Sequence, residues 1–191
     1  MLTCFVRGLS LGLDLFVAPA ASIEETETTL RILPLLAALL SMTCAASAVA
    51  QVVHVGPSGS PIATASVVPA GYGMVYVSGQ TPPALNTSAP AGTPPEFGDT
   101  KTQTVGIMKK IADVLKAQGL TMGDVVMMRV YLVGDPAKGG KMDFGGMMEG
   151  YTQFFGTADQ PNKPARVTAQ VAALVAPGML AEIEVQAAKK P

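Results

Sequence analysis

KPARVTAQVAAL (residues 163–174) and LAEIEVQA (residues 180–187) are the two stretches that decide the predicted fold. In the second stretch, small or apolar residues alternate strictly with glutamate or glutamine, and the first stretch alternates in part. A Pro177-Gly178 turn lies between them. Alternation with a period of two on both sides of a Pro-Gly turn predicts a β-hairpin.

The predicted hairpin brings charged side chains together. Arg166 lies near the start of the first strand, while Glu182 and Glu184 lie on the second. We therefore expect the arginine to approach one of the two glutamates. A guanidinium and a carboxylate that face one cleft can hold a small anionic substrate and a water or proton-transfer group. From these residues alone, a structural ion pair between the strands is the preferred interpretation.

Composition limits the classes of function. The chain has 191 residues, is 49% hydrophobic and has a formal net charge of −1. Its charges are scattered, which argues against nucleic acid as a partner. Both cysteines, Cys4 and Cys44, precede residue 51, and the one histidine is His54. Residues 51–191 therefore have no thiol nucleophile and no set of residues for a zinc site of the Cys/His type.

A leader is expected over residues 1–50. Residues 30–50, LRILPLLAALLSMTCAASAVA, contain one arginine, an apolar run and an Ala-x-Ala ending. This order is typical of a secretory signal, with cleavage before Gln51. Acidic residues upstream suit either a natural start nearer Leu30 or one long, unusual leader or anchor. We expect a periplasmic or secreted protein whose folded domain spans residues 51–191, with a cytoplasmic location as the alternative.

Two helices and several strands are predicted in the domain. The strands are expected at residues 52–55, 62–68, 73–80 and 125–133, the first helix from Asp99 or Thr100 to Gln118, and the second after an Asp143 cap. The second helix has an apolar stripe, which we interpret as core: Phe144, Met147, Met148, Tyr151, Phe154 and Phe155. This order predicts a single α+β domain, a mixed sheet with both helices on one face.

The other face of the predicted sheet has no helix to cover it. We take that face to include Met128, Val130, Val171 and Val185. An apolar sheet face of this kind is normally buried, so we expect another subunit to cover it.

Several short motifs occur in an order and at spacings that are familiar from one family. They are VSGQ (77–80), GL (119–120), DVV (124–126), VYL (130–132), Tyr151 with Phe154-Phe155, PAR (164–166) and EIE (182–184). Each motif is weak alone, but the ordered set, from about residue 61 to 188, resembles the RidA/YjgF family of enamine and imine deaminases. The resemblance implies a chorismate-mutase-like homotrimer with clefts between subunits and no metal or organic cofactor.

The resemblance also implies an activity and a site. The activity is hydrolysis of small reactive 2-imino acids, such as 2-iminopropanoate, to 2-keto acids and ammonia. Arg166 matches the arginine that binds the substrate carboxylate, and Glu182 matches the glutamate that positions the attacking water. Ser78 and Gly79 match the pair that lines the pocket, and Thr168 takes the position whose backbone carbonyl faces the substrate nitrogen. The resemblance therefore favours a catalytic interpretation of Arg166 and Glu182 over a structural one.

Two departures from the family pattern affect the expected pocket. Ile62 stands where the family has a pocket tyrosine, and Met148 stands where it has an asparagine in the second helix. Both changes make the pocket more apolar, which fits a divergent branch that acts on a different imine. The alternative is an exported trimer that binds a small carboxylate or a protein partner without turnover.

Overall fold

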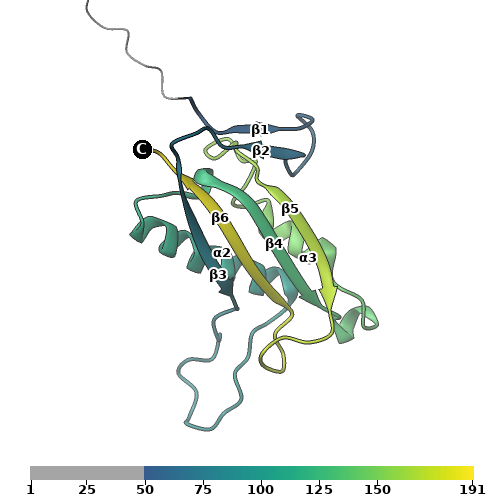
Figure 1. Cartoon of the computed structure of the whole chain (residues 1–191). Coiled ribbons are helices and arrows are strands. Elements are labelled where there is room, and N and C mark those ends of the chain that lie inside the picture. Colours follow the sequence, from purple (N-terminus) through teal and green to yellow (C-terminus); the bar gives the residue numbers. More distant parts are fainter. Residues whose placement is uncertain (1–49) are drawn as a thin grey trace, which may run out of the picture. The chain divides into compact units, whose positions relative to one another are not determined.

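The structure of the protein, a computed structural model, describes residues 50–191 (Figure 1). The predicted leader lies outside the described residues, apart from Ala50. The elements are β1 (Val53–Val55), β2 (Ala65–Val67), β3 (Gly73–Gln80), α2 (Thr100–Ala117), β4 (Val125–Val133), α3 (Phe144–Tyr151), β5 (Ala165–Val171) and β6 (Ala181–Lys189). Short 3₁₀ turns occupy Met122–Asp124 and Pro136–Lys138. Within the described part, no helix is both long enough and apolar enough to cross a membrane.

Four strands form one mixed sheet in the order β3-β6-β4-β5. The pairs β3–β6 and β6–β4 are antiparallel, and β4–β5 is parallel. Both helices lie behind this sheet in Figure 1, and they pack against each other. β1 and β2 form a separate two-stranded sheet at one end. The prediction of an α+β domain with two helices on one face of a mixed sheet is confirmed.

The predicted hairpin is wrong. β5 and β6 are both strands, but β4 lies between them and pairs with each. Residues 172–180 cross over the end of β4 instead of making a tight turn. Alternation reports that one face of a strand is buried, and it carries no information on which strand is its neighbour. Glu184 accordingly pairs with Arg129 of β4, at 2.7 Å, and not with Arg166.

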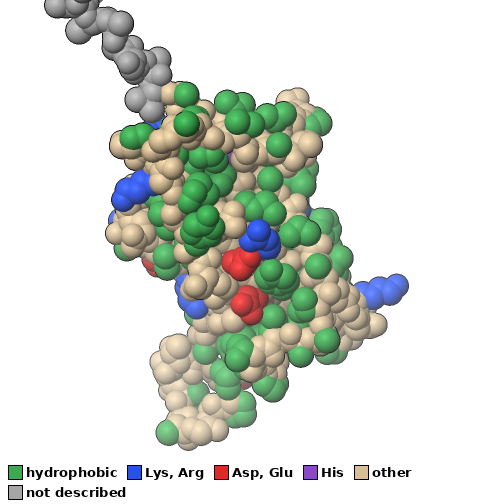
Figure 2. Space-filling view, viewed as in Figure 1, with side chains coloured by type: hydrophobic (Ala, Val, Ile, Leu, Met, Phe, Trp, Pro, Cys, Tyr) green, Lys and Arg blue, Asp and Glu red, His purple; other side chains and the backbone are tan. Residues whose placement is uncertain are grey.

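The assignment of residues to the uncovered face also needs correction. Met128, Val130 and Val185 are buried in the core beneath the helices and do not lie on the uncovered face. The uncovered face carries the alternate residues of the same strands, including the exposed Tyr76 and the Arg129–Glu184 ion pair. Figure 2 shows acidic and basic side chains among apolar ones on this face. We call it the open face; its cover by another subunit remains a prediction.

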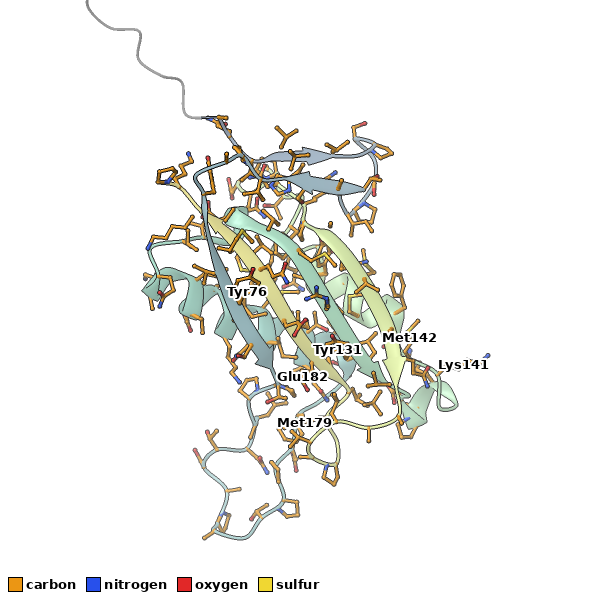
Figure 3. The ribbon with its side chains drawn as sticks, viewed as in Figure 1. Tyr76, Tyr131, Lys141, Met142, Met179 and Glu182 are labelled. Carbon is orange, nitrogen blue, oxygen red and sulfur yellow. The ribbon has the colours of Figure 1, made fainter. Side chains whose placement is uncertain are left out.

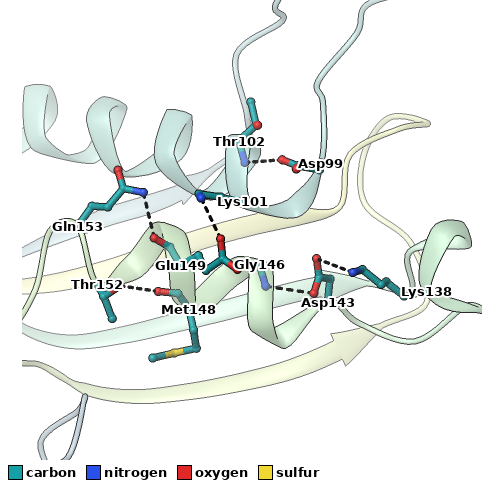
Figure 4. A network of polar contacts seen from close by, with 10 residues as sticks. All are labelled: Asp99, Lys101, Thr102, Lys138, Asp143, Gly146, Met148, Glu149, Thr152 and Gln153. Atoms are coloured by element: carbon teal, nitrogen blue, oxygen red, sulfur yellow. Dashed lines mark hydrogen bonds and ion pairs between the residues drawn. The ribbon is translucent and has the colours of Figure 1, made fainter.

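Both predicted helix caps are confirmed. An Asp99 carboxylate oxygen accepts a hydrogen bond from the Thr102 amide at 2.8 Å and begins α2. Asp143 accepts from the Gly146 amide at 3.1 Å and begins α3 (Figure 4). α3 ends at Tyr151, so only part of the predicted apolar stripe is helical. These caps satisfy backbone N–H groups that have no partner inside a helix.

Gln103 of α2 ties together three segments that lead to the candidate site. Its side chain is buried, its Nε2 donates to the Gly98 and Gly178 carbonyls, and its Oε1 accepts from the Leu180 amide at 2.7 Å. This amide therefore fixes the chain directly before β6. It also fixes the end of the proline-rich loop before α2.

We expect Gln103→Leu to lower the free energy of unfolding by about 3 kcal/mol, because two carbonyls and one amide lose their partners in a buried place. Chemical denaturation followed by circular dichroism measures this. The control is Gln118→Leu at the exposed end of α2, which should change stability by less than about 0.5 kcal/mol. Equal effects of the two substitutions would contradict the role assigned to Gln103.

Candidate functional site

Among the described residues, Arg166 is a cation without an anionic partner. No carboxylate in the described part of the chain lies within 4.0 Å of its guanidinium. Its Nη2 lies 3.2 Å from the Met148 sulfur and its Nη1 3.9 Å from the Met147 sulfur. The guanidinium carbon lies 4.4 Å from the centre of the Tyr151 ring and 5.8 Å from that of Phe144. Burial among these groups lowers the pKa of Arg166 below its usual value.

The surroundings hold this guanidinium in place. Arg166 pairs in register with Met128, whose side chain is buried beneath the helices, so Arg166 points toward α3. Tyr151 is fully buried, its hydroxyl donates to the Pro61 carbonyl at 3.0 Å, and its ring stacks on Phe155. Burial raises the pKa of Tyr151 to about 12, so the ring stays neutral and offers its π face to the cation. We call Arg166 and its four neighbours the Arg166 site.

Soft acceptors and aromatic faces stabilise a cation less than a carboxylate does. Thioether sulfur is a weak hydrogen-bond acceptor, and a cation–π contact is worth about 0.5–2 kcal/mol. The guanidinium therefore retains donor capacity for a strong acceptor. A planar fork of N–H groups in this state is suited to a carboxylate.

The Glu182 side chain lies on the face of the sheet opposite to Arg166, in close contact with Gly79. The β3–β6 pairing shifts register between Val77 and Gln80, which places a bulge at Ser78-Gly79. A Cβ atom on Gly79 would overlap the Glu182 carboxylate oxygen and lie 3.0 Å from its Cδ. Only glycine leaves this carboxylate its present place. The structure thus brings together Ser78, Gly79 and Glu182, which we call the Glu182 site.

The Glu182 site opens on the open face of the sheet. Glu182 is half-buried and pairs in register with Tyr131 of β4 (Figure 3). Beside it, a hollow of about 330 Å³ is lined by Tyr76, Val77, Ser78, Arg129, Glu184, Val185 and Gln186. Arg129 and Glu184 form an ion pair there, and no cation among the described residues lies within 4.0 Å of the Glu182 carboxylate.

Thr168 lies two residues beyond Arg166 on β5 and shares its side of the sheet. Its hydroxyl oxygen is buried and has no hydrogen-bond partner among the described residues. A buried hydroxyl without a partner is unusual and costs stability. The role expected for the Thr168 backbone carbonyl stays a prediction.

The Arg166 and Glu182 sites are separate within one chain. Glu182 lies on β6 and Arg166 on β5, two strand spacings or about 10 Å apart across the sheet, and their side chains point to opposite faces. Ser78 and Gly79 are farther still, at the opposite edge strand. Within a single chain, Arg166 therefore does not lie beside Ser78 and Gly79.

Helical spacing did not reveal the walls of the Arg166 site. It led to an interpretation of Phe144, Met148 and Tyr151 as core, and only the family resemblance placed Met148 at the pocket. Tyr151 does belong to the core, but all three residues also contact the guanidinium. A helical stripe three or four residues apart gives no sign that a cation lies against it. In residues 50–191, no three His, Cys, Asp or Glu side chains are grouped so as to hold a metal ion.

Known proteins resemble this chain in sequence and in fold. The family model described as Endoribonuclease L-PSP matches residues 61–189. A RutC family protein from Pyrococcus horikoshii is 37% identical over 93 residues, which are 49% of this chain and 65% of that protein. Another, from Pyrococcus abyssi, is 33% identical over 101 residues, which are 53% of this chain and 68% of that protein. The first match thus spans just under two thirds of its relative's length.

Among solved structures, the Rid family protein YyfB from Yersinia pestis superposes with a TM-score of 0.53 at 21% identity. The superposition covers 72% of this chain and 98% of that one, and at this identity it shows a shared fold. The family model adds a match in sequence across almost the whole described domain. The chain therefore belongs to the endoribonuclease L-PSP family, the RidA/YjgF family that its motifs resemble.

Proposed function

We propose that this protein hydrolyses small 2-imino acids to 2-keto acids and ammonia. The observation that carries the proposal is the Arg166 guanidinium, which is held in a fixed place and has no anionic partner within residues 50–191. A desolvated cation is costly to maintain unless it serves a purpose, and perturbed titratable groups cluster at functional sites. Membership of the family and the glycine-dependent position of Glu182 support the same assignment.

In the proposed reaction, Arg166 binds the substrate carboxylate through two parallel N–H···O bonds. Glu182 accepts a hydrogen bond from a water molecule and directs its oxygen at the imine carbon. The water adds across the C=N bond, and Glu182 takes its proton and passes it to the nitrogen. The hydroxyl of the tetrahedral intermediate then gives its proton to the amino nitrogen through Glu182, the C=O bond forms as the C–N bond breaks, and ammonia and a 2-keto acid are released. Thr168 is proposed to face the substrate nitrogen, and Ser78 with Gly79 to line the pocket.

The test is a coupled assay in which an amino-acid oxidase generates 2-imino acids in the presence of the full chain. Faster loss of imine with the wild type, and none of this acceleration with Arg166→Ala, supports the proposal. If no small 2-imino acid is consumed, the alternative function takes its place. That alternative is a protein that binds a small carboxylate without turnover, and it is favoured by Met148, which lies against the guanidinium where the family has an asparagine.

We also propose that the site is completed between subunits of a homotrimer. Arg166 lies on the edge strand β5, whereas Glu182 and Gly79 lie toward the opposite edge. A neighbouring copy that packs its β5 edge near the β3–β6 end of the first copy would bring both half-sites together. Sedimentation velocity at micromolar concentration should give a trimer, and a monodisperse monomer would contradict this arrangement.

A mixing experiment tests the shared site directly. Arg166→Met and Glu182→Gln should each be inactive alone. Trimers refolded from an equal mixture should regain about a quarter of wild-type activity, because about a quarter of the sites between subunits receive an intact Arg166 from one variant and an intact Glu182 from the other. The variants mixed without refolding are the control. No recovery from properly assembled mixed trimers would show that both residues act from one chain.

The export predicted from residues 30–50 remains a proposal as well. Sequencing of the N-terminus of protein from the periplasm or medium should begin near Gln51. Retention of Met1 on protein from the cytoplasm would overturn it.

A further inference from the structure

The contact between Met148 and Arg166 joins an oxidisable group to a cation that lacks a strong acceptor. The Met148 sulfur lies 3.2 Å from Nη2 of Arg166, and Met148 projects from α3 (Figure 4). Met148 is half-buried, whereas the adjacent Met147 is fully buried. An oxidant from solution therefore reaches the Met148 sulfur more readily than the Met147 sulfur.

We propose that Met148 is a redox modification site, and that its sulfoxide occupies the anion-binding donors of Arg166 and blocks the site. The inference rests on the proposed function in one respect, namely that Arg166 binds a carboxylate. The modification itself and its contact with the guanidinium are independent of that function.

The oxidant is hydrogen peroxide or a related peroxide. The sulfur lone pair of Met148 attacks one peroxide oxygen and the O–O bond breaks. The thioether is oxidised by two electrons to the sulfoxide, and the leaving hydroxide takes the remaining proton to become water. Reductases of methionine sulfoxide reverse the step, so the modification can act as a switch.

The surroundings explain why oxidation here has a specific effect. In most apolar places a sulfoxide is a buried polar group without a partner and destabilises the fold. At Met148 the new oxygen lies beside a guanidinium whose other neighbours are aromatic rings and the Met147 sulfur. A hydrogen bond to a charged donor is about twice as strong as one between neutral groups. The sulfoxide is therefore stabilised in the position that a carboxylate needs.

The experiment treats the full chain with hydrogen peroxide and locates each added oxygen by peptide mapping. Arg166 is followed by its side-chain ¹⁵N resonances, and binding of pyruvate, a stable 2-keto acid, is followed by calorimetry. Oxidised wild type should show shifted Arg166 resonances and about tenfold weaker pyruvate binding, and a methionine sulfoxide reductase should restore both. Met148→Leu should be insensitive to peroxide in both measurements.

Met74→Leu is the matched control, since Met74 is 37% exposed on β3 and lies away from Arg166. This variant should remain as sensitive to peroxide as the wild type. The proposal is overturned if Met148 stays unmodified while Met74 is fully oxidised, or if Arg166 resonances do not move on its oxidation. Shifted resonances in a protein that never binds pyruvate would leave the sulfoxide contact in place and refute the proposed carboxylate site instead.

Discussion

Arg166→Lys is expected to lower kcat/KM for 2-imino acid hydrolysis by about 30- to 150-fold, which corresponds to roughly 2–3 kcal/mol of oriented binding. Lysine keeps the charge but offers a single point of contact on a flexible stem, so the carboxylate is no longer held by two parallel bonds. Arg166→Met removes the donors altogether and should abolish measurable hydrolysis. The coupled imine assay measures both.

Neither substitution should unfold the protein. The guanidinium has no ion pair in the described part of the chain to lose, and methionine removes a partly desolvated charge from a place lined by sulfur and rings. We expect the free energy of unfolding of Arg166→Met to stay within about 1 kcal/mol of wild type. Lys109→Met is the control, because Lys109 is exposed on α2 and lies outside both sites, so the activity of this variant should stay at the wild-type level. Full activity in Arg166→Lys would contradict the proposed role.

Gly79→Ala is expected to lower kcat by about 100-fold, because a displacement of about 1 Å at a reacting group has an effect of this size. The added Cβ overlaps the present position of the Glu182 carboxylate, so the side chain must move away from where it directs the water. The backbone of Gly79 does not require glycine for its φ angle. The effect should therefore appear in activity more than in stability.

Gly73→Ala on the same strand is the matched control for Gly79→Ala. A Cβ on Gly73 meets Lys189 atoms at 3.9 Å, which is an ordinary contact. This variant should retain activity within about twofold. If both alanine variants behave alike, the position of Glu182 does not depend on Gly79.

Local sequence signals predicted the elements well. Asp99 and Asp143 correctly predicted where the two helices begin, because a short acidic side chain satisfies free N–H groups at the start of a helix. The apolar run of β4 and the alternation of β6 reflect how each strand is buried. These patterns depend only on neighbours along the chain, so they can be recognised in the sequence without knowledge of the rest of the fold.

The order of the strands could not be predicted in this way. The insertion of β4 between β5 and β6 depends on which edges meet across long separations, and alternation is the same for either neighbour. That error carried over to the site, because it placed Arg166 beside Glu182 in one chain. The contacts of Met148 and Phe144 with Arg166 were missed for a related reason: an apolar residue on a helix looks the same against a cation as against the core.

The position of β6 determines when this sheet can form during synthesis. β6 follows the other three strands of this sheet in the chain, yet it is a central strand that pairs with β3, the first strand of the sheet, and with β4. Residues as far apart as Gly73 and Lys189 must meet, which makes the fold rich in non-local contacts and slow to form. An emerging chain therefore exposes the apolar residues of β3 and β4 until β6 (Ala181–Lys189) has left the ribosome, and chaperones have an extended time in which to bind it.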